Sequence, residues 1–277
     1  MPAVFWALIV LGFLIGAYGT IIGVGGGFIL VPVLLSIYPD ESPEIITSIS
    51  LAVVLFNSLS GSLAYGRLKR IDYRAGLIFS VATVPGAILG SLTTSWFPRD
   101  TFEFIFGVLT LVVSIMLVLS PTARKPLSIT VENQIPQNAE LGSQIVTRHW
   151  LMGTIFSTFL GYVSNLMGVG AGFLFVPALV YFLRFPVQTA TATSQFILAI
   201  TAFSGTVTHI VGGHFHHGIR RTIALAIGVI IGAQVGALFS GRLKDQWIIL
   251  SLALALALVG IKLSVWRYFS HLFNWPG

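Results

Sequence analysis

The chain has 277 residues, of which 55% are hydrophobic and only 9% are charged. Soluble domains carry about a quarter charged residues, so this composition excludes an ordinary soluble domain and predicts a polytopic membrane protein. The net charge of +6 does not indicate a nucleic-acid partner, because the Lys and Arg residues fall in short segments between apolar blocks, where they set topology. The absence of cysteine excludes disulfides, thiolate metal sites and cysteine catalysis.

Taken in chain order, the apolar blocks predict eight helical membrane spans. They cover residues 4–35, 45–65, 75–95, 102–119, 150–183, 190–211, 222–239 and 247–265. The first and the fifth are longer than the roughly 20 residues that one crossing needs. Residues 121–147 are rich in Pro, Asn and Gln and predict a polar linker. We therefore expect an N-terminal transmembrane repeat over 1–120 and a C-terminal transmembrane repeat over 148–277.

One motif occurs in both long blocks. Residues 23–32 read Gly-Val-Gly-Gly-Gly-Phe-Ile-Leu-Val-Pro, and residues 168–177 read Gly-Val-Gly-Ala-Gly-Phe-Leu-Phe-Val-Pro. Dense glycine destabilises a helix, and proline cannot donate an intrahelical hydrogen bond. The motif thus predicts a broken helix in each half. Matching Thr, Ser and Gly residues in the following span extend the duplication. The expected fold class is an all-α polytopic membrane protein with two homologous four-span repeats, each containing a broken glycine-rich helix.

The basic residues leave the relative orientation of the two halves open. If each long block crosses once, eleven Lys and Arg residues lie on the side of both termini and four on the other, which places the termini in the cytoplasm. If the first and fifth blocks fold back, the halves are inverted and the split becomes ten against five, with the chain ends on the less basic side. We favour eight crossings, although parallel and inverted repeats are both compatible with the charges.

Broken helices in a membrane offer backbone N–H groups and the positive end of a helix dipole, which suit an anion. All nine Asp and Glu residues fall in loops or at span ends, so no carboxylate is expected at the bilayer centre to bind a cation. The candidate substrate-binding residues are Gly23, Gly25, Gly26, Gly27, Gly168, Gly170, Gly172, Thr20, Asn165, Ser50, Ser194, Gln195 and Asn57. The alternative is that these small residues serve helix packing and bond their own backbone.

Histidine provides two further candidates. His209 is an ionisable residue inside a predicted span and is therefore a candidate for a proton-linked role, with a neutral, packed histidine as the alternative. His214, His216 and His217 have no Cys or carboxylate beside them, so a solvated loop is favoured over a metal site. The glycine motif lacks a following Lys-Ser/Thr and does not predict a nucleotide loop. No cofactor is expected.

With this duplicated motif, the Thr/Ser-bearing span after each copy and two four-span halves, the chain resembles the sulfite exporter TauE/SafE family. The resemblance covers nearly the whole chain. It implies a carrier in the cytoplasmic membrane of a bacterium or archaeon for sulfite, sulfoacetate or related organosulfonates. Carried over by position, the implied functional residues are the motif glycines, Pro32 and Pro177. Ala171 departs from the pattern, because Gly26 stands at that position of the first copy, so the two halves need not act equally.

We therefore expect a secondary transporter that moves a small sulfur-containing anion by alternating access. No ATP-binding motif is present, so an ion gradient or the substrate gradient would drive it. The expected partners are the anion, the lipid bilayer and a coupling ion (proton or sodium), with a homodimer as an option. Three alternatives stay open: an anion channel with a glycine-lined filter, an intramembrane enzyme, for which no nucleophile–base pair is found at depth, and a membrane subunit of a larger machine.

Overall fold

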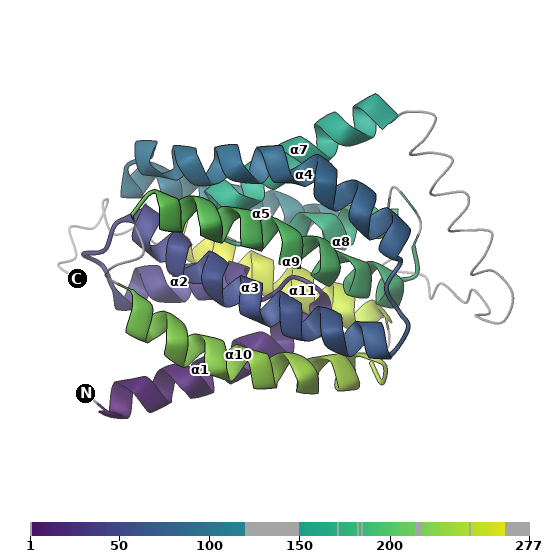
Figure 1. Ribbon diagram of the computed structural model, residues 1–277, viewed down its shortest axis with the longest axis horizontal. Helices are drawn as coiled ribbons and strands as arrows, with labels where there is room; N and C mark the ends of the chain where they lie inside the picture. Colours follow the sequence, from purple (N-terminus) through teal and green to yellow (C-terminus); the bar gives the residue numbers. More distant parts are fainter. Residues whose placement is uncertain are drawn as a thin grey trace, which may run out of the picture.

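The computed structural model of the protein describes residues 2–119, 150–170, 172–181, 183, 185–213, 218–243 and 245–263. Within these ranges the chain is helical, without strands (Figure 1). The elements are α1 (Pro2–Ile22), α2 (Gly27–Ile37), α3 (Pro43–Arg67), α4 (Tyr73–Thr93), the 3₁₀ helix η1 (Thr94–Trp96), α5 (Arg99–Leu119), α7 (Trp150–Leu166), α8 (Gly172–Tyr181), α9 (Val187–Val211), α10 (Ile219–Ser240) and α11 (Asp245–Ile261). The expected linker at 121–147, Ala171, His214, His216 and His217 lie outside the described residues.

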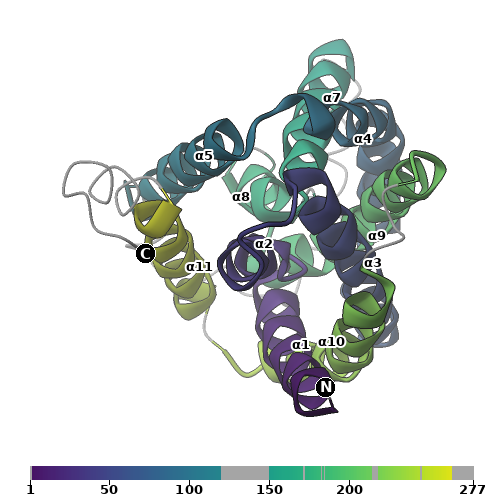
Figure 2. The same ribbon diagram turned by 90° about the vertical axis from the view of Figure 1, so that its left-hand side faces the viewer.

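Six of the described helices, namely α1, α3, α4, α5, α9 and α10, are long and apolar enough to cross a membrane. The protein is therefore a multi-pass membrane protein. Helices α2 and α8 are much shorter, with 11 and 10 residues, and both contain a proline, Pro32 and Pro177. At 1.5 Å per residue each extends for about 16 Å, half of the hydrocarbon core. Figure 2 shows α2 and α8 in the middle of the molecule, ringed by the longer helices.

Glycines bring two pairs of helices into close, parallel contact. A Cβ atom added at Gly12 would lie 3.1 Å from the Leu225 Cα, and one added at Gly236 would lie 3.1 Å from the Ala17 Cα. The contact between α1 and α10 therefore advances along both helices in the same direction. Helices α4 and α7 pack in the same way, because Gly86 meets Tyr162 and Gly90 meets Leu166. Small residues of this kind allow helix backbones to approach closely in a membrane.

Helices α3 and α9 pack against each other and run antiparallel. Gly61 of α3 lies beside Gln195, near the start of α9, while Leu51 lies beside Gly205, nearer its end. Helix α10 runs parallel to α3, since the Ser60 hydroxyl donates to the Ile230 carbonyl and Arg70 to Ser240.

Helix α4 in turn runs parallel to α9. The Asp72 N–H donates to the Thr193 hydroxyl, and Gly205 lies beside Ser91 further along both helices. The remaining pair, α5 and α11, is antiparallel on one flank of the molecule (Figure 2), because Ser114 bonds Ala253 while Gly107 lies beside Gly260.

These directions correct the expected crossing of residues 4–35 and 150–183. Helices α1 and α3 both run parallel to α10, so α2 between them must return toward the side where α1 begins. Helices α7 and α9 both run parallel to α4, so α8 likewise turns back. The favoured arrangement of eight single crossings is therefore wrong at both long blocks. Apolar length alone cannot distinguish a span from a hairpin, because the two have the same composition.

Candidate functional site

The two glycine motifs meet in the interior of the protein. A Cβ atom added at Gly27 would lie only 2.6 Å from the Val169 carbonyl oxygen. One added at Gly172 would lie 2.8 Å from the Gly23 carbonyl oxygen and 2.9 Å from the Val24 Cα. All described residues of both loops are buried. The backbones are thus in direct contact, at a distance that only glycine permits.

The loops adopt a backbone conformation that requires glycine. Gly23, Gly25 and Gly26 have φ angles of +80°, +74° and +78°, and Gly168 and Gly170 have φ angles of +69° and +74°. Side chains disfavour this left-handed region by roughly 1–2 kcal/mol per residue. The motif therefore encodes a sharp end to α1 and α7 rather than a generally flexible segment.

Most of the loop amides are already bonded. The N–H of Gly23 donates to the Thr20 carbonyl, and those of Val24 and Gly25 donate to the Gly19 carbonyl. The second loop repeats this pattern: Gly168 N–H donates to Asn165, and Val169 and Gly170 N–H donate to Ser164. These bonds cap the carbonyl ends of α1 and α7. They are contrary to our expectation of free amide donors at Gly23, Gly25, Gly168 and Gly170.

Backbone N–H groups without a capping side chain are found just after the first loop, at the start of α2. Gly26 is its N-cap and makes no side-chain cap bond. The first N–H groups of a helix have no intrahelical partner, and they carry the positive end of the helix dipole. Helix α8 begins at Gly172, against the backbone of Gly23 and Val24. Two positive helix ends therefore converge on the contact between the loops.

Thr20, Asn57 and Gln195 form a neutral polar cluster on one side of this contact. The Thr20 hydroxyl donates to the Asn57 Oδ1 at 3.4 Å, and the Gln195 Nε2 donates to the Gly19 carbonyl at 3.3 Å. All three side chains are fully buried. Among the described residues, the Asn57 Nδ2 and the Gln195 Oε1 have no hydrogen-bond partner. A buried amide without a partner costs free energy, which makes this cluster the best candidate for a ligand's polar group.

Asn165 is placed on the other side of the contact, apart from the first cluster. Its Nδ2 donates to the carbonyls of Ala87 and Thr201 at 3.3 and 3.1 Å, and its Oδ1 has no partner in the described part of the chain. Ser91 lies close by across Gly205. The expected set thus divides into two clusters rather than one.

The other expected residues occupy different surroundings. The Ser194 hydroxyl donates to the Gly23 carbonyl at 2.7 Å and so binds the first loop to α9. Ser50 is buried with its hydroxyl unpartnered in the described structure. His209 is 1% exposed, one helical turn beyond Gly205 in α9. It lies inside the helix assembly and does not face lipid.

The structure adds residues that the sequence did not indicate. Val54 and Leu198 lie against both loops: a Cβ atom at Gly25 or Gly170 would meet the Leu198 side chain and lie 3.3 or 3.1 Å from the Val54 Cγ1. Both are ordinary aliphatic residues in apolar spans, so nothing in the sequence distinguishes them. Only the folded contact shows that one valine and one leucine serve both motifs.

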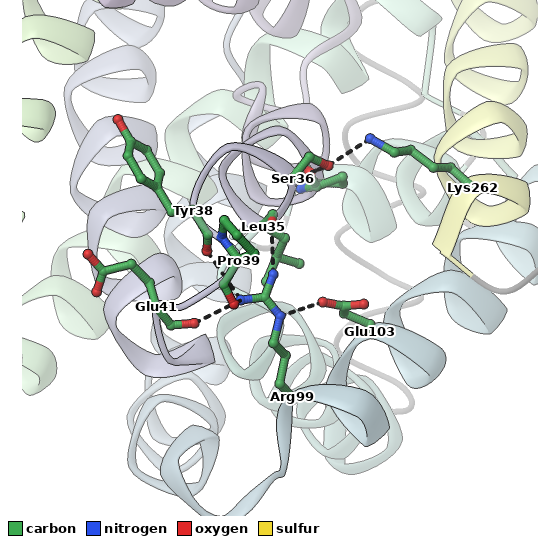
Figure 3. Close-up of polar contacts among 9 residues, drawn as sticks. Leu35, Ser36, Tyr38, Pro39, Glu41, Arg99, Glu103 and Lys262 are labelled. Carbon is green, nitrogen blue, oxygen red and sulfur yellow. Dashed lines mark hydrogen bonds and ion pairs between the residues drawn. The ribbon is translucent and has the colours of Figure 1, made fainter. Parts of the chain in front are cut away.

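Arg99 holds the outer end of α2 (Figure 3). Its guanidinium donates to the backbone carbonyls of Leu35, Tyr38, Pro39 and Glu41, and it pairs with the Glu103 carboxylate at 2.7 Å. A cation at the carbonyl end of a helix is stabilised by the helix dipole.

Two further cations reach the same end of α2. Arg221 pairs with Glu41 at 2.8 Å and lies over the Tyr38 ring. Lys262, at the end of α11, donates to the Ser36 hydroxyl. We call Arg99, Arg221 and Lys262 the basic clamp. It anchors α2 to α5, α10 and α11.

The comparisons with known proteins agree with a membrane transporter. The family model described as Sulfite exporter TauE/SafE matches residues 8–263, nearly the whole chain. The chain belongs to this family. It is 31% identical to the probable membrane transporter protein YunE of Bacillus subtilis, over 94% of this chain and 97% of that protein. A probable membrane transporter protein of Xylella fastidiosa is 28% identical over 94% of this chain and 95% of its own length.

A more distant relative, a probable membrane transporter protein of Methanocaldococcus jannaschii, is 22% identical over 92% of this chain and 93% of its own length. No solved structure matches the chain. The family is one of transporters, not of enzymes. This removes the intramembrane enzyme from the functions that composition had left open.

Proposed function

We propose that the protein is a secondary carrier of a small sulfur-containing anion such as sulfite or sulfoacetate, and that the anion binds where the two glycine loops meet. The observation that carries the proposal is the convergence of two helix N-termini on one buried contact. Helix N-termini bind anions through free N–H groups and the helix dipole. In transporters, such interrupted helices surround the substrate near the bilayer midplane.

The directions of the helices support two repeats of inverted orientation. Helices α1, α3 and α10 run one way, and α4, α7 and α9 run the other. Helix α11 runs with the second group, because Lys262 at its end bonds Ser36 at the end of α2, and the antiparallel α5 runs with the first. Each helix of the first half is therefore opposed by its counterpart in the second. In this arrangement the basic residues divide ten against five, with the chain ends on the less basic side. The positive-inside rule then places both ends outside the cytoplasm, the reverse of the orientation that eight crossings imply.

Cysteine labelling tests this orientation directly, because the native chain has no cysteine. Asp40 is exposed on the side where α1 begins, and Lys69 is exposed on the opposite side. In cells, Asp40→Cys should react with an impermeant maleimide and Lys69→Cys should react only after the membrane is opened. If instead Lys69→Cys reacts in intact cells and Asp40→Cys does not, both chain ends lie in the cytoplasm and the proposed orientation is wrong.

The two polar clusters suggest how the anion passes. Asn57 and Gln195 lie beyond the loop contact toward the end of α3, whereas Asn165 and Ser91 lie beyond it toward the end of α4. The loops close the path between them. In alternating access, the anion would exchange between neutral amide donors on either side as one half moves against the other. His209 is the candidate for proton coupling, because no other histidine occurs in the membrane-spanning helices that the structure describes.

A transport assay separates the carrier from one of the remaining alternatives, an anion channel. Purified protein in proteoliposomes should show saturable sulfite counterflow, and a thermal-shift screen should show higher stability with sulfite or sulfoacetate than with common carboxylates. Gly25→Leu and Gly170→Leu should abolish both signals. Gly213→Leu is the matched control, because Gly213 has a φ of +76° with no described atom near its Cβ position. Large unsaturable currents would instead support the channel.

A further inference from the structure

A groove of about 650 Å³ lies away from the glycine loops, on the opposite face of α3. Its walls are the second half of α3 and the middle of α9, and the start of α4 closes one end. Leu55, Leu59 and Leu63 line it at helical spacing, facing Phe196 and Phe203. Asn57 and Gly61 belong to the other face of α3, so the groove is separate from the candidate substrate path.

The groove opens sideways, toward lipid. Leu59, Leu63 and Phe203 are 45%, 63% and 58% exposed. On a membrane-spanning helix such residues face hydrocarbon. From Leu55 to Arg67 the groove extends for about 18 Å at 1.5 Å per residue. One leaflet contributes about half of the 30 Å hydrocarbon core. The groove therefore has the length of one acyl chain lying in a single leaflet.

The end of the groove that lies near the membrane–water interface is polar and cationic. Arg67 lines it at the last residue of α3 and has no acidic partner among the described residues. The Ser62 hydroxyl lines it too, buried and without a hydrogen-bond partner in the described structure. Tyr73 lines this end as well, and its hydroxyl lies over Gly66, the residue before Arg67. A guanidinium and two hydroxyl groups at the headgroup level match a phosphate.

This cationic end is particular to one half of the chain. The position 144 residues after Arg67 is Val211, which has no charge to offer. The nearby Arg70 is already bonded to Ser240 on α10, whereas Arg67 has no side-chain bond to the part of the chain that the structure describes. Basic residues at the membrane surface attract anionic lipids, and here the attraction is combined with an apolar groove that accepts a single chain.

We propose that this groove is a binding site for one anionic phospholipid of the surrounding leaflet. One acyl chain lies along Leu55, Leu59 and Phe203, and the phosphate lies against Arg67, Ser62 and Tyr73. The site is independent of the transported anion.

Native mass spectrometry of the detergent-purified protein tests the site. After incubation with phosphatidylglycerol or with phosphatidylcholine of the same acyl chains, the wild-type protein should retain one phosphatidylglycerol preferentially. Arg67→Gln should reduce that preference roughly fivefold. Arg74→Gln, an exposed cation of the same interface that does not line the groove, should leave it unchanged.

A second pair of variants tests the acyl chain. Leu63→Trp should reduce retention of both lipids by narrowing the groove, and Leu77→Trp, at an exposed apolar residue of α4 outside it, should not. Equal retention of the two lipids by the wild type, or unchanged preference in Arg67→Gln, would overturn the proposal. It would also be overturned if Leu63→Trp lost a protein dimer and no lipid, because the groove would then belong to an interface between copies.

Discussion

Adding a single methyl group where the glycine loops touch tests the importance of their contact. In Gly27→Ala the new carbon would lie 2.6 Å from the Val169 carbonyl oxygen and 2.8 Å from the Val54 Cγ2. The new carbon would also lie 2.9 Å from the Val169 Cα. A relaxed contact between carbon atoms is about 3.5 Å, so the two backbones must separate by roughly 0.6 Å. Gly172→Ala meets the Gly23 carbonyl oxygen at 2.8 Å and should act similarly from the other side.

The cost of each substitution comes from overpacking alone, because neither glycine has a positive φ. Overpacking a core costs about 1–3 kcal/mol, and we expect each alanine to lower the unfolding free energy by that amount. The double variant should cost less than the sum of the two, since one separation of the loops relieves both contacts. Thermal unfolding of the purified protein measures the stability, and sulfite counterflow in proteoliposomes measures transport.

Gly213→Ala is the control for a protein that is merely less stable. Gly213 has a φ of +76° and no described atom within 4 Å of its Cβ position, so alanine there adds backbone strain of roughly 1–2 kcal/mol without a clash. It should leave counterflow intact, whereas Gly27→Ala should reduce counterflow about tenfold, equivalent to 1.4 kcal/mol. If both variants transport equally well, the contact between the loops has no part in transport and the reasoning is refuted.

Three further substitutions test the surroundings of the loops. Asn57→Leu removes the unpartnered buried amide and should weaken sulfite binding by about tenfold in a thermal-shift titration, since a hydrogen bond to a charged group contributes about 1.5–3 kcal/mol; unchanged affinity would exclude this amide from the site. Arg99→Gln removes the centre of the basic clamp and should lower the unfolding free energy by about 2–3 kcal/mol, with the exposed Arg220→Gln as a control that should stay within 0.5 kcal/mol; equal stability of the two variants would count against the clamp. Gly232→Leu should prevent α1 from packing on α10 and yield aggregated protein by size-exclusion chromatography, because its side chain would meet the Phe13 backbone; a monodisperse, stable variant would contradict this packing.

The sequence predicted the helical class and the family, because both rest on local patterns. Apolar blocks of membrane-spanning length determine the first, and the motifs at 23–32 and 168–177 determine the second. Glycine density also indicates where α1 and α7 stop, since the left-handed φ angles of Gly23 and Gly168 depend on the residue itself.

The path of the chain through the membrane could not be predicted, because α2 and α8 have the composition of any apolar helix. Their return follows only from the parallel packing of α1 on α10 and of α4 on α7. The division of the polar residues into two clusters was missed for the same reason. Asn57 and Gln195 belong to different halves of the sequence, and only the antiparallel contact of α3 with α9 brings them together.

Leu198 occupies the space in front of both Gly25 and Gly170, with Val54 beside it. One side chain therefore closes off both loops at the same point. Under the proposed alternating access, a motion that moved the first loop away from Leu198 would leave this side chain against the second loop. If the protein is the proposed carrier, this one aliphatic side chain would keep a continuous water-filled passage from forming, and the membrane would stay sealed during each transport cycle.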